Sequence, residues 1–490
     1  MLPFENIISV DRNSNIAIYK QIAISIINAI NNGTLKAGAK LPSSRELSKL
    51  LGLHRKTIVA AYEELSAQDW IQSSPRKSIT VSNQIPMLYP KIDVKQNKVL
   101  AYENKLSLPF KIVKKEPKNS ENDNSKITIN DGYPDVRLSP LDELLKTYRS
   151  YLARNYAIEN AHIGNDQGTI SLREELAEFL AESRGLNIKP DNILITHGAQ
   201  MSIYLASKLL LNDGDIVVVG NPNYSNANET FEEVGAKLLE VNVDANGLDV
   251  DKIEQICRKK KITAVYVIPH HHYPTTVTLS VERRMKLLAL SQQYSFVIIE
   301  DDYDYDYHYN SSPYLPLANA NHSGNVIYIG SFSKILDPSL RIGFMVAPAN
   351  FIAQTVALRK LIDVGGDGYM QNALASLIKN GELKRHLKRA LKAYHFRRDF
   401  LNELLEKKLG KYVQYNIPSG GMAFWIELKA PYKIKDLVKD PQLKIKRWDE
   451  ALNAFRFGFA SMNEQELTIT VTYLAKLFKK MDDQQSGLSE

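Results

Sequence analysis

The chain has 490 residues, of which 44% are hydrophobic and 24% are charged, as in an ordinary folded globular protein of two or three domains. Its single cysteine, Cys257, excludes an intrachain disulfide. Residues 1–10 lack the pattern of a secretory signal, and no apolar run approaches the roughly eighteen residues of a membrane span. We therefore expect a cytoplasmic protein.

The net charge of +7 is unevenly distributed along the chain. Residues 1–83 carry +4, residues 84–126 carry +4, and the remaining 364 residues carry −1. This asymmetry indicates that the amino-terminal part meets a polyanion while the rest of the chain has another role. For residues 84–126 taken alone, the simpler interpretation is that the lysines merely keep the segment soluble.

The pattern of residues 1–83, called the head below, predicts three helices. Apolar residues between Tyr19 and Ile30 have the spacing of one buried helical stripe. Ser43 and Glu46 have the spacing of a capping box that starts a second helix, and Gly52 ends it. A third helix begins near His54, so the last two helices form a helix-turn-helix.

The segments 70–74 and 79–81 predict a hairpin after the third helix, as in the wing of a winged helix. The last helix of such a module lies in the DNA major groove, and a wing tip contacts the backbone or the minor groove. The alternative is a set of solvated helices with incidental charge. The residues placed for DNA contact are Arg45, His54, Arg55, Lys56, Thr57, Arg76 and Lys77.

Residues 84–126 are rich in Lys, Asn and Pro and have no sustained periodicity, which predicts a flexible basic linker. As a coil of about 43 residues it would span roughly 35 Å.

Residues 127–490, called the body below, alternate short apolar runs with longer helical segments. This pattern predicts an α/β fold with a mainly parallel sheet covered by helices on both faces. From about residue 390 we expect a long basic helix and a smaller α+β subdomain. The predicted strands are 193–196, 216–219, 264–268, 296–300, 326–329 and 342–346, and the predicted helices include 172–184, 199–211 and 281–293.

The end of the strand 326–329 has the residues of a site for a phosphorylated aldehyde. Ligands bind at strand ends in open α/β sheets, and Lys334 in such a place can form a Schiff base. Ser331, Ser333 and Arg341 can surround a phosphate with donors and positive charge. The alternative is an exposed lysine after a buried strand.

Four other places supply what pyridoxal phosphate needs. Residues 196–200 join a strand to a helix start, where free N–H groups favour a phosphate. The ring of Tyr224 suits stacking on a pyridine, and the carboxylate of Asp301 could keep the ring nitrogen protonated. Arg456 is a candidate for binding a carboxylate of a substrate or effector. Taken singly, each of these residues could instead belong to a tight turn, to the core or to a solvated loop. Taken together, they are consistent with one cofactor site.

Three consecutive histidines, His270, His271 and His272, raise the possibility of a metal site with Asp301 or Asp304. Adjacent residues of an extended segment point to opposite faces and cannot easily bind one ion. We therefore predict no metal.

The head resembles the GntR-type winged helix through Tyr19-Lys20-Gln21-Ile22, Leu41-Pro42-Ser43-Ser44-Arg45 and Ala61-Tyr62-Glu63-Glu64-Leu65. The segment around Lys334 resembles the attachment segment of fold-type I aminotransferases, so the whole chain is similar to the MocR subfamily of GntR regulators. The resemblance implies a bacterial transcription factor that binds double-stranded DNA and pyridoxal 5'-phosphate. It further implies a head-to-tail homodimer that responds to an amino compound or to the cofactor itself.

The resemblance also assigns roles to single residues. Lys334 would form the internal aldimine, Asp301 would pair with the ring nitrogen, Tyr303 would approach the ring hydroxyl and Tyr224 would stack. Arg456 would take a carboxylate. The phosphate would be bound by Gly198, Ala199, Gln200, Ser331, Ser333 and Arg341.

Three positions depart from the family pattern. Ile163 stands where the family usually has a tyrosine, Thr276 stands where it usually has glycine, and the wing turn 75–78 lacks the usual glycines. The first two changes would lower cofactor affinity or turnover.

Three hypotheses therefore remain open from the sequence. The first is a regulator that senses an amine through aldimine chemistry at Lys334 and has at most residual transaminase activity. The second is a working aminotransferase with an appended DNA-binding head. The third is a DNA-binding protein whose body has lost its cofactor.

Overall fold

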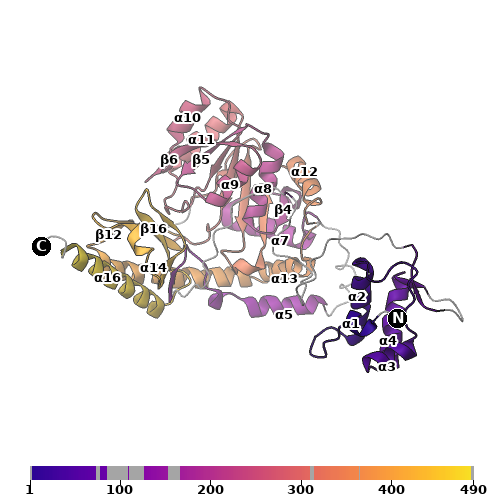
Figure 1. Ribbon diagram of the computed structural model, residues 1–490. Helices are drawn as coiled ribbons and strands as arrows, with labels where there is room; N and C mark the ends of the chain where they lie inside the picture. Colours follow the sequence, from indigo (N-terminus) through magenta and orange to yellow (C-terminus); the bar gives the residue numbers. More distant parts are fainter. Residues whose placement is uncertain are drawn as a thin grey trace. The chain divides into compact units, whose positions relative to one another are not determined.

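The computed structural model describes residues 3–72, 78–84, 109, 126–152, 166–309, 314–363 and 365–486. The chain forms two compact units, residues 1–112 and 113–490; the first contains the head and the second the body (Figure 1). Within the described residues, no helix is long and apolar enough to cross a membrane. The predicted linker and the wing turn lie mostly outside the described residues.

The head contains the predicted helix-turn-helix. α3 (Ser44–Leu51) begins at the predicted capping box, in which the Ser43 hydroxyl accepts from the Glu46 N–H and the Glu46 carboxylate accepts from the Ser43 N–H. Gly52 ends the helix with a φ of 63°, which lets the chain turn into α4 (Arg55–Ala67). The other elements are α1 (Phe4–Ile7), α2 (Ile18–Asn31) and the antiparallel strands β1 (Ile71–Gln72) and β2 (Thr80–Val81).

One hydrophobic core holds the head together. The predicted stripe of α2, including Ile22, Ile26 and Ile30, packs in a cluster with Ile58 of α4. The hydroxyl of Tyr62 donates to the carbonyl of Pro42 at 2.8 Å, which links α4 to the segment before α3. The start of α4 is therefore supported from behind while its first residues face solvent.

The body is built on an eight-stranded sheet with the order β4-β11-β10-β9-β8-β5-β6-β7. β11 and β7 run opposite to the other six strands, which confirms the prediction of a mainly parallel sheet. The carboxyl ends of the parallel strands therefore lie at one edge. The strands are β4 (Ile193–Thr196), β5 (Ile216–Asn221), β6 (Lys237–Asp244), β7 (Gly247–Leu248), β8 (Ala264–Val267), β9 (Val297–Asp302), β10 (Val326–Ser331) and β11 (Gly343–Val346).

Helices cover both faces of this sheet, as predicted. Ile299 faces one core together with α8, α9 and α12, whereas Ile298 faces the other face with α10 and α11, and α7 and α13 pack farther along that face. Successive strand residues point to opposite faces. Asp301 therefore lies on the same face as Ile299, whereas Glu300 and Asp302 lie on the same face as Ile298. The helices are α5 (Leu141–Leu152), α7 (Ile170–Arg184), α8 (Ala199–Leu210), α9 (Ser225–Glu233), α10 (Val250–Cys257), α11 (Val281–Tyr294), α12 (Ala349–Arg359) and α13 (Gly368–Lys379).

The end of the chain forms a second, smaller sheet with the order β12-β13-β16-β15, called the carboxyl-terminal sheet. The long helix before it begins at Glu382, and its buried side chains join the core of this sheet. β3 (Ile127–Ile129) pairs in parallel with β14, although more than 300 residues separate them. The elements are α14 (Glu382–Leu409), β12 (Val413–Tyr415), β13 (Ala423–Leu428), α15 (Ile434–Leu437), β14 (Leu443–Ile445), β15 (Trp448–Asp449), β16 (Ala454–Gly458) and α16 (Glu464–Ser486).

Candidate cofactor site

Lys334 lies three residues after the end of β10, at the edge where the parallel strands end. Its Nζ donates to the carbonyl of Gly132 at 2.6 Å and lies 4.8 Å from the ring centroid of Tyr133. Burial lowers the pKa of the Lys334 amine to about 8. A larger fraction of this amine is therefore neutral, and so nucleophilic, at neutral pH than in an exposed lysine.

Asp301 lies at the end of the neighbouring strand β9 and is buried. Its Oδ2 accepts a hydrogen bond from the hydroxyl of Tyr266 at 2.7 Å, and its Oδ1 is buried with no hydrogen-bond partner. Burial raises the pKa of the Asp301 carboxyl to about 7. A buried oxygen without a partner is costly, so it fits a ligand that brings an N–H, such as a pyridine ring nitrogen.

The turn between β4 and α8 has no room for a side chain beyond hydrogen. A Cβ on Gly198 would lie 2.7 Å from a guanidinium nitrogen of Arg341, and a Cβ on Gly343 would lie 2.6 Å from the Gly198 carbonyl carbon. Arg341 donates to the carbonyl of His197 at 3.1 Å. The backbone at the start of α8 thus lies against a guanidinium, a combination that favours an anion such as a phosphate.

Hydroxyl and amide side chains complete this cradle. The Ser331 hydroxyl accepts from the Ser333 N–H at 3.1 Å, while the Ser333 hydroxyl is buried without a partner. Ala199 is the first residue of α8, where backbone N–H groups have no partner within the helix. Gln200 donates to the Thr230 hydroxyl at 2.7 Å and leaves its Oε1 buried and unpaired. The free Ser333 hydroxyl fits a phosphate oxygen.

Tyrosine rings line the site beyond β5 and β9. The ring of Tyr224 meets that of Tyr273 edge-on, with centroids 5.6 Å apart. The Tyr303 hydroxyl donates to the carbonyl of His271 at 2.8 Å and accepts from Arg456 at 3.0 Å. Tyr303 is therefore held by the body itself, and the sequence alone did not indicate these contacts.

Arg456 lies on β16 and is only 1% exposed. Its guanidinium donates to the carbonyl of Asp131 at 2.7 Å, to the carbonyl of Pro274 at 2.7 Å and to the Tyr303 hydroxyl. Three of its five N–H donors are thus used by the protein. This side chain joins the carboxyl-terminal sheet to the edge of the large sheet.

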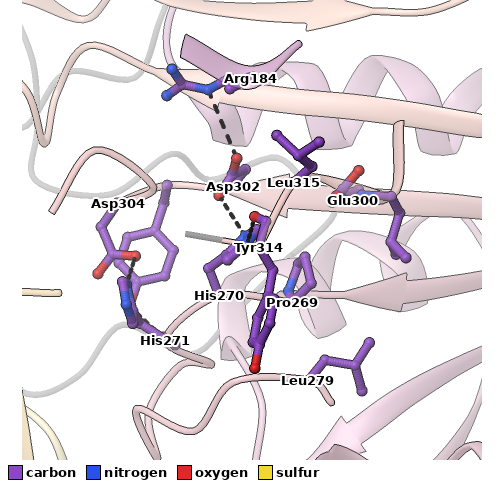
Figure 2. A network of polar contacts seen from close by, with 12 residues as sticks. Arg184, Pro269, His270, His271, Leu279, Glu300, Asp302, Asp304, Tyr314 and Leu315 are labelled. Atoms are coloured by element: carbon purple, nitrogen blue, oxygen red, sulfur yellow. Dashed lines mark hydrogen bonds and ion pairs between the residues drawn. The ribbon is translucent and has the colours of Figure 1, made fainter. Parts of the chain in front are cut away.

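Figure 2 shows a buried network around Asp302. Asp302 lies on the opposite face of β9 from Asp301, because successive strand residues alternate between the faces. Asp302 accepts from the Tyr328 hydroxyl at 2.6 Å and lies 3.9 Å from Arg184 and 3.4 Å from His270. This network holds the end of β9 and so the position of Asp301. Sequence analysis missed it, although the run of three acids at 300–302 was a signal that two of them must face away from the site.

The three consecutive histidines are directed to different oxygens. Among the described residues, no group of His, Cys, Asp or Glu side chains is arranged to hold a metal ion. One ring nitrogen of His270, of His271 and of His272 lies 2.6, 2.9 and 2.9 Å from Tyr314 O, Asp304 Oδ1 and Pro222 O, respectively.

Thr276 has a φ of 64°, in the left-handed region that favours glycine. The glycine of the family pattern would meet that requirement without strain. Ile163, the other departure in the body, lies outside the described residues.

The head presents its predicted DNA-contacting residues at the start of two helices. Arg45, Arg55 and Lys56 are exposed, and Thr57 is half-buried. His54 caps α4, and its ring nitrogen accepts from the Lys56 N–H at 3.3 Å. Arg76 and Lys77 lie outside the described residues.

Fold and site together define a winged helix-turn-helix head on a body with the architecture of a pyridoxal phosphate-dependent aminotransferase. Residues 123–474 match the family model "Aminotransferase class I and II", and residues 18–81 match "Bacterial regulatory proteins, gntR family". The chain therefore belongs to the aminotransferase class I and II family and has a GntR-type head, the arrangement of the MocR-type regulators.

Known relatives and solved structures agree with both parts. The chain is 28% identical to the uncharacterized regulator YdfD of Bacillus subtilis, over 85% of this chain and 86% of the relative. It is 25% identical to the probable rhizopine catabolism regulatory protein MocR of Rhizobium meliloti, over 84% and 82%. The kynurenine aminotransferase of Pyrococcus horikoshii, solved with PMP, superposes with a TM-score of 0.67 at 28% identity, over 73% of this chain and 92% of that one.

Proposed function

We propose that this protein is a transcription regulator whose body binds pyridoxal phosphate at Lys334 and whose head changes its DNA binding when an amino compound, or the cofactor itself, is bound. The observation that carries the proposal is the buried, unpartnered Oδ1 of Asp301 at the same sheet edge as Lys334. In this proposal Asp301 Oδ1 is the partner of a pyridine nitrogen, and the Lys334 amine is the partner of an aldehyde. In this proposal residues 1–83 bind the operator and residues 84–126 connect the head to the body.

Bound pyridoxal phosphate supplies an aldehyde that condenses with amines and a ring that withdraws electrons. Lys334 provides the amine, and its lowered pKa of about 8 keeps part of it neutral. Asp301 Oδ1 would accept the N–H of the ring nitrogen, and Tyr224 would cover the ring. The phosphate would be held by Gly198, Ala199, Gln200, Ser331, Ser333 and Arg341.

When it is not bonded to the cofactor, the Lys334 amine would have an acceptor in the carbonyl of Gly132. Gly132 follows β3, which pairs with β14, and a Cβ added to Gly132 would lie 3.4 Å from that of Ala423 in β13. The Lys334 amine would thus have two alternative partners, the cofactor and a segment packed on the carboxyl-terminal sheet. A ligand that favours one of these two states shifts the conformation of the body, which is the signal we propose for the head of a head-to-tail homodimer.

A working aminotransferase is the second candidate, because a partly neutral lysine beside the cofactor is also suited to move a proton. Rapid release of keto acids from several amino donors would favour this candidate over the regulator.

The test is borohydride reduction of the protein loaded with pyridoxal phosphate, followed by peptide mass spectrometry. We expect the modification on Lys334, and we expect Lys334→Ala to lose it. Lys446→Ala, which removes an exposed lysine beside the same Tyr133 ring, is the matched control and should keep the modification. An operator selected from random duplexes by the wild-type protein should bind Lys334→Ala with unchanged affinity when no effector is present. Modification elsewhere, or loss of DNA binding in Lys334→Ala, would contradict the proposal.

A further inference from the structure

The long helix α14 carries a group of cations to which the proposed function gives no role. Its buried residues Leu383, His386 and Ala390 recur at the spacing of one helical face. Every exposed side chain between Leu383 and Tyr394 is a cation. These residues, called the basic face of α14 below, are Lys384, Arg385, Lys388, Arg389 and Lys392.

The basic face does not stabilise the helix that carries it. Lys384 and Arg385 are the third and fourth residues of α14, where the partial positive charge of the helix N-terminus disfavours a cation. Like charges four residues apart repel each other on a helix surface. The face contains the like-charged pairs Lys384–Lys388, Arg385–Arg389 and Lys388–Lys392. Burial of the opposite face holds the helix in the body, so the cations point to a partner outside it.

Most of the basic face lacks a counter-ion. Lys384 donates to Glu182 at 3.1 Å, and Arg385 donates to Glu382 at 2.6 Å. Four residues of a helix rise only about 6 Å, so the remaining charges lie close together. The cations that form no ion pair within the part of the chain that the structure describes are Lys388, Arg389 and Lys392. Because residues 127–490 carry a net charge of −1, this positive surface is a local feature of the body.

A concentration of unpaired cations fits a polyanion, and the head is of a type that brings DNA to this protein. Lysine and arginine neutralise phosphates and release condensed counterions, which stabilises a complex without reading its sequence. A membrane surface fits less well, because a helix that lies on lipid needs an exposed apolar face, whereas the apolar face of α14 is buried in the body.

We propose that the basic face of α14 binds the phosphate backbone of the duplex that flanks the operator. The body then adds a second, sequence-independent DNA contact to that of the head. This goes beyond the proposed function, in which only the head binds DNA.

The experiment measures the affinity of the full chain for two duplexes by gel-shift titration. One duplex holds only the operator selected from random duplexes, and the other adds flanks of about 30 bp on each side, roughly 100 Å of DNA each. We expect the flanks to raise the affinity of the wild type about tenfold or more at about 50 mM salt. The triple variant Lys388→Gln, Arg389→Gln and Lys392→Gln should lose this gain and bind the short duplex as the wild type does.

The dependence on salt gives a second readout. On the long duplex, the slope of log K against log salt should be smaller by about two to three in the variant, because each lost phosphate contact removes about 0.9. Urea denaturation should show that the variant is no less stable than the wild type, since like-charged pairs have been removed. A lower stability would assign these cations to the fold and overturn the proposal.

The matched control is the triple variant Lys259→Gln, Lys260→Gln and Lys261→Gln, which removes the same charge from three exposed consecutive residues shortly after α10. We expect it to keep the gain from the flanks. The proposal is wrong if the flanks add nothing in the wild type, if the α14 variant keeps the gain, if the control loses it equally, or if the α14 variant also binds the short duplex more weakly.

Vesicles of phosphatidylcholine and phosphatidylserine test the other polyanion. Binding to them that the α14 variant loses, without any effect of the flanks on DNA affinity, would assign the basic face to a lipid surface and overturn the proposal. Failure to select any operator would contradict the proposed function together with this one, whereas an operator whose flanks add nothing contradicts only the role of α14.

Discussion

Asp301→Asn tests the electrostatics on which the cofactor site depends. The folded protein raises the pKa of the Asp301 carboxyl from its ordinary 3.8 to about 7, chiefly through burial. Asparagine keeps the shape and can still accept from the Tyr266 hydroxyl, but it cannot ionise. Any cost of burying its amide is independent of pH, so the variant isolates the cost of ionising Asp301.

The direction and size of the change in stability with pH follow from the linkage between protonation and folding. Between pH 5 and pH 7 the carboxyl is ionised in the unfolded chain and protonated in the folded one, so unfolding releases a proton and stability falls as pH rises. The fall is about 1.4 kcal/mol per pH unit and ends near pH 7. From pH 5 to pH 8.5 the wild type should thus lose about 3 kcal/mol relative to Asp301→Asn, by the same conversion.

The assay is urea denaturation of both proteins without added pyridoxal phosphate, at pH 5 and pH 8.5. Added cofactor should shrink the difference, because Asp301 then gains an N–H donor, whereas Asp301→Asn should respond little to the cofactor. A free-energy difference between the two proteins that does not change with pH would refute the reasoning, since it would mean that Asp301 ionises as it does in water.

Two other predictions concern the DNA interface and the strained turn. Arg55→Ala should weaken operator binding by roughly 1–3 kcal/mol in a gel-shift titration if Arg55 reads a base. Lys20→Ala, which removes an exposed lysine on α2, should leave the affinity unchanged. Equal effects of the two substitutions would remove Arg55 from the interface. Thr276→Gly should raise the free energy of unfolding by up to about 1 kcal/mol, because its φ of 64° strains a β-branched residue. Thr278→Gly, at a position without positive φ, should lower it; the same sign in both variants would count against strain.

Local patterns sufficed for most of the fold. Short apolar runs marked β4, β5, β8, β9, β10 and β11, and the Ser43 and Glu46 pair marked the start of α3. The strand β6, which lies beside the short edge strand β7, was missed. Only one of its eight residues is buried, and Glu240 and Asn242 interrupt its apolar residues, so it lacks the continuous apolar run that marked the central strands. Lys334 and Asp301 were found because each stands at or shortly after the end of a strand, a relation that is visible along the chain.

The amino-acid sequence by itself determined the order of elements, the caps and turns, and which residue types stand at strand ends, since these depend on neighbours within a few positions. Only the tertiary structure decided that β3 pairs with β14 and that Arg456 is occupied by carbonyls of the body. The physical reason is that a hydrogen bond across 300 residues depends on how the chain packs, and no local pattern carries that information.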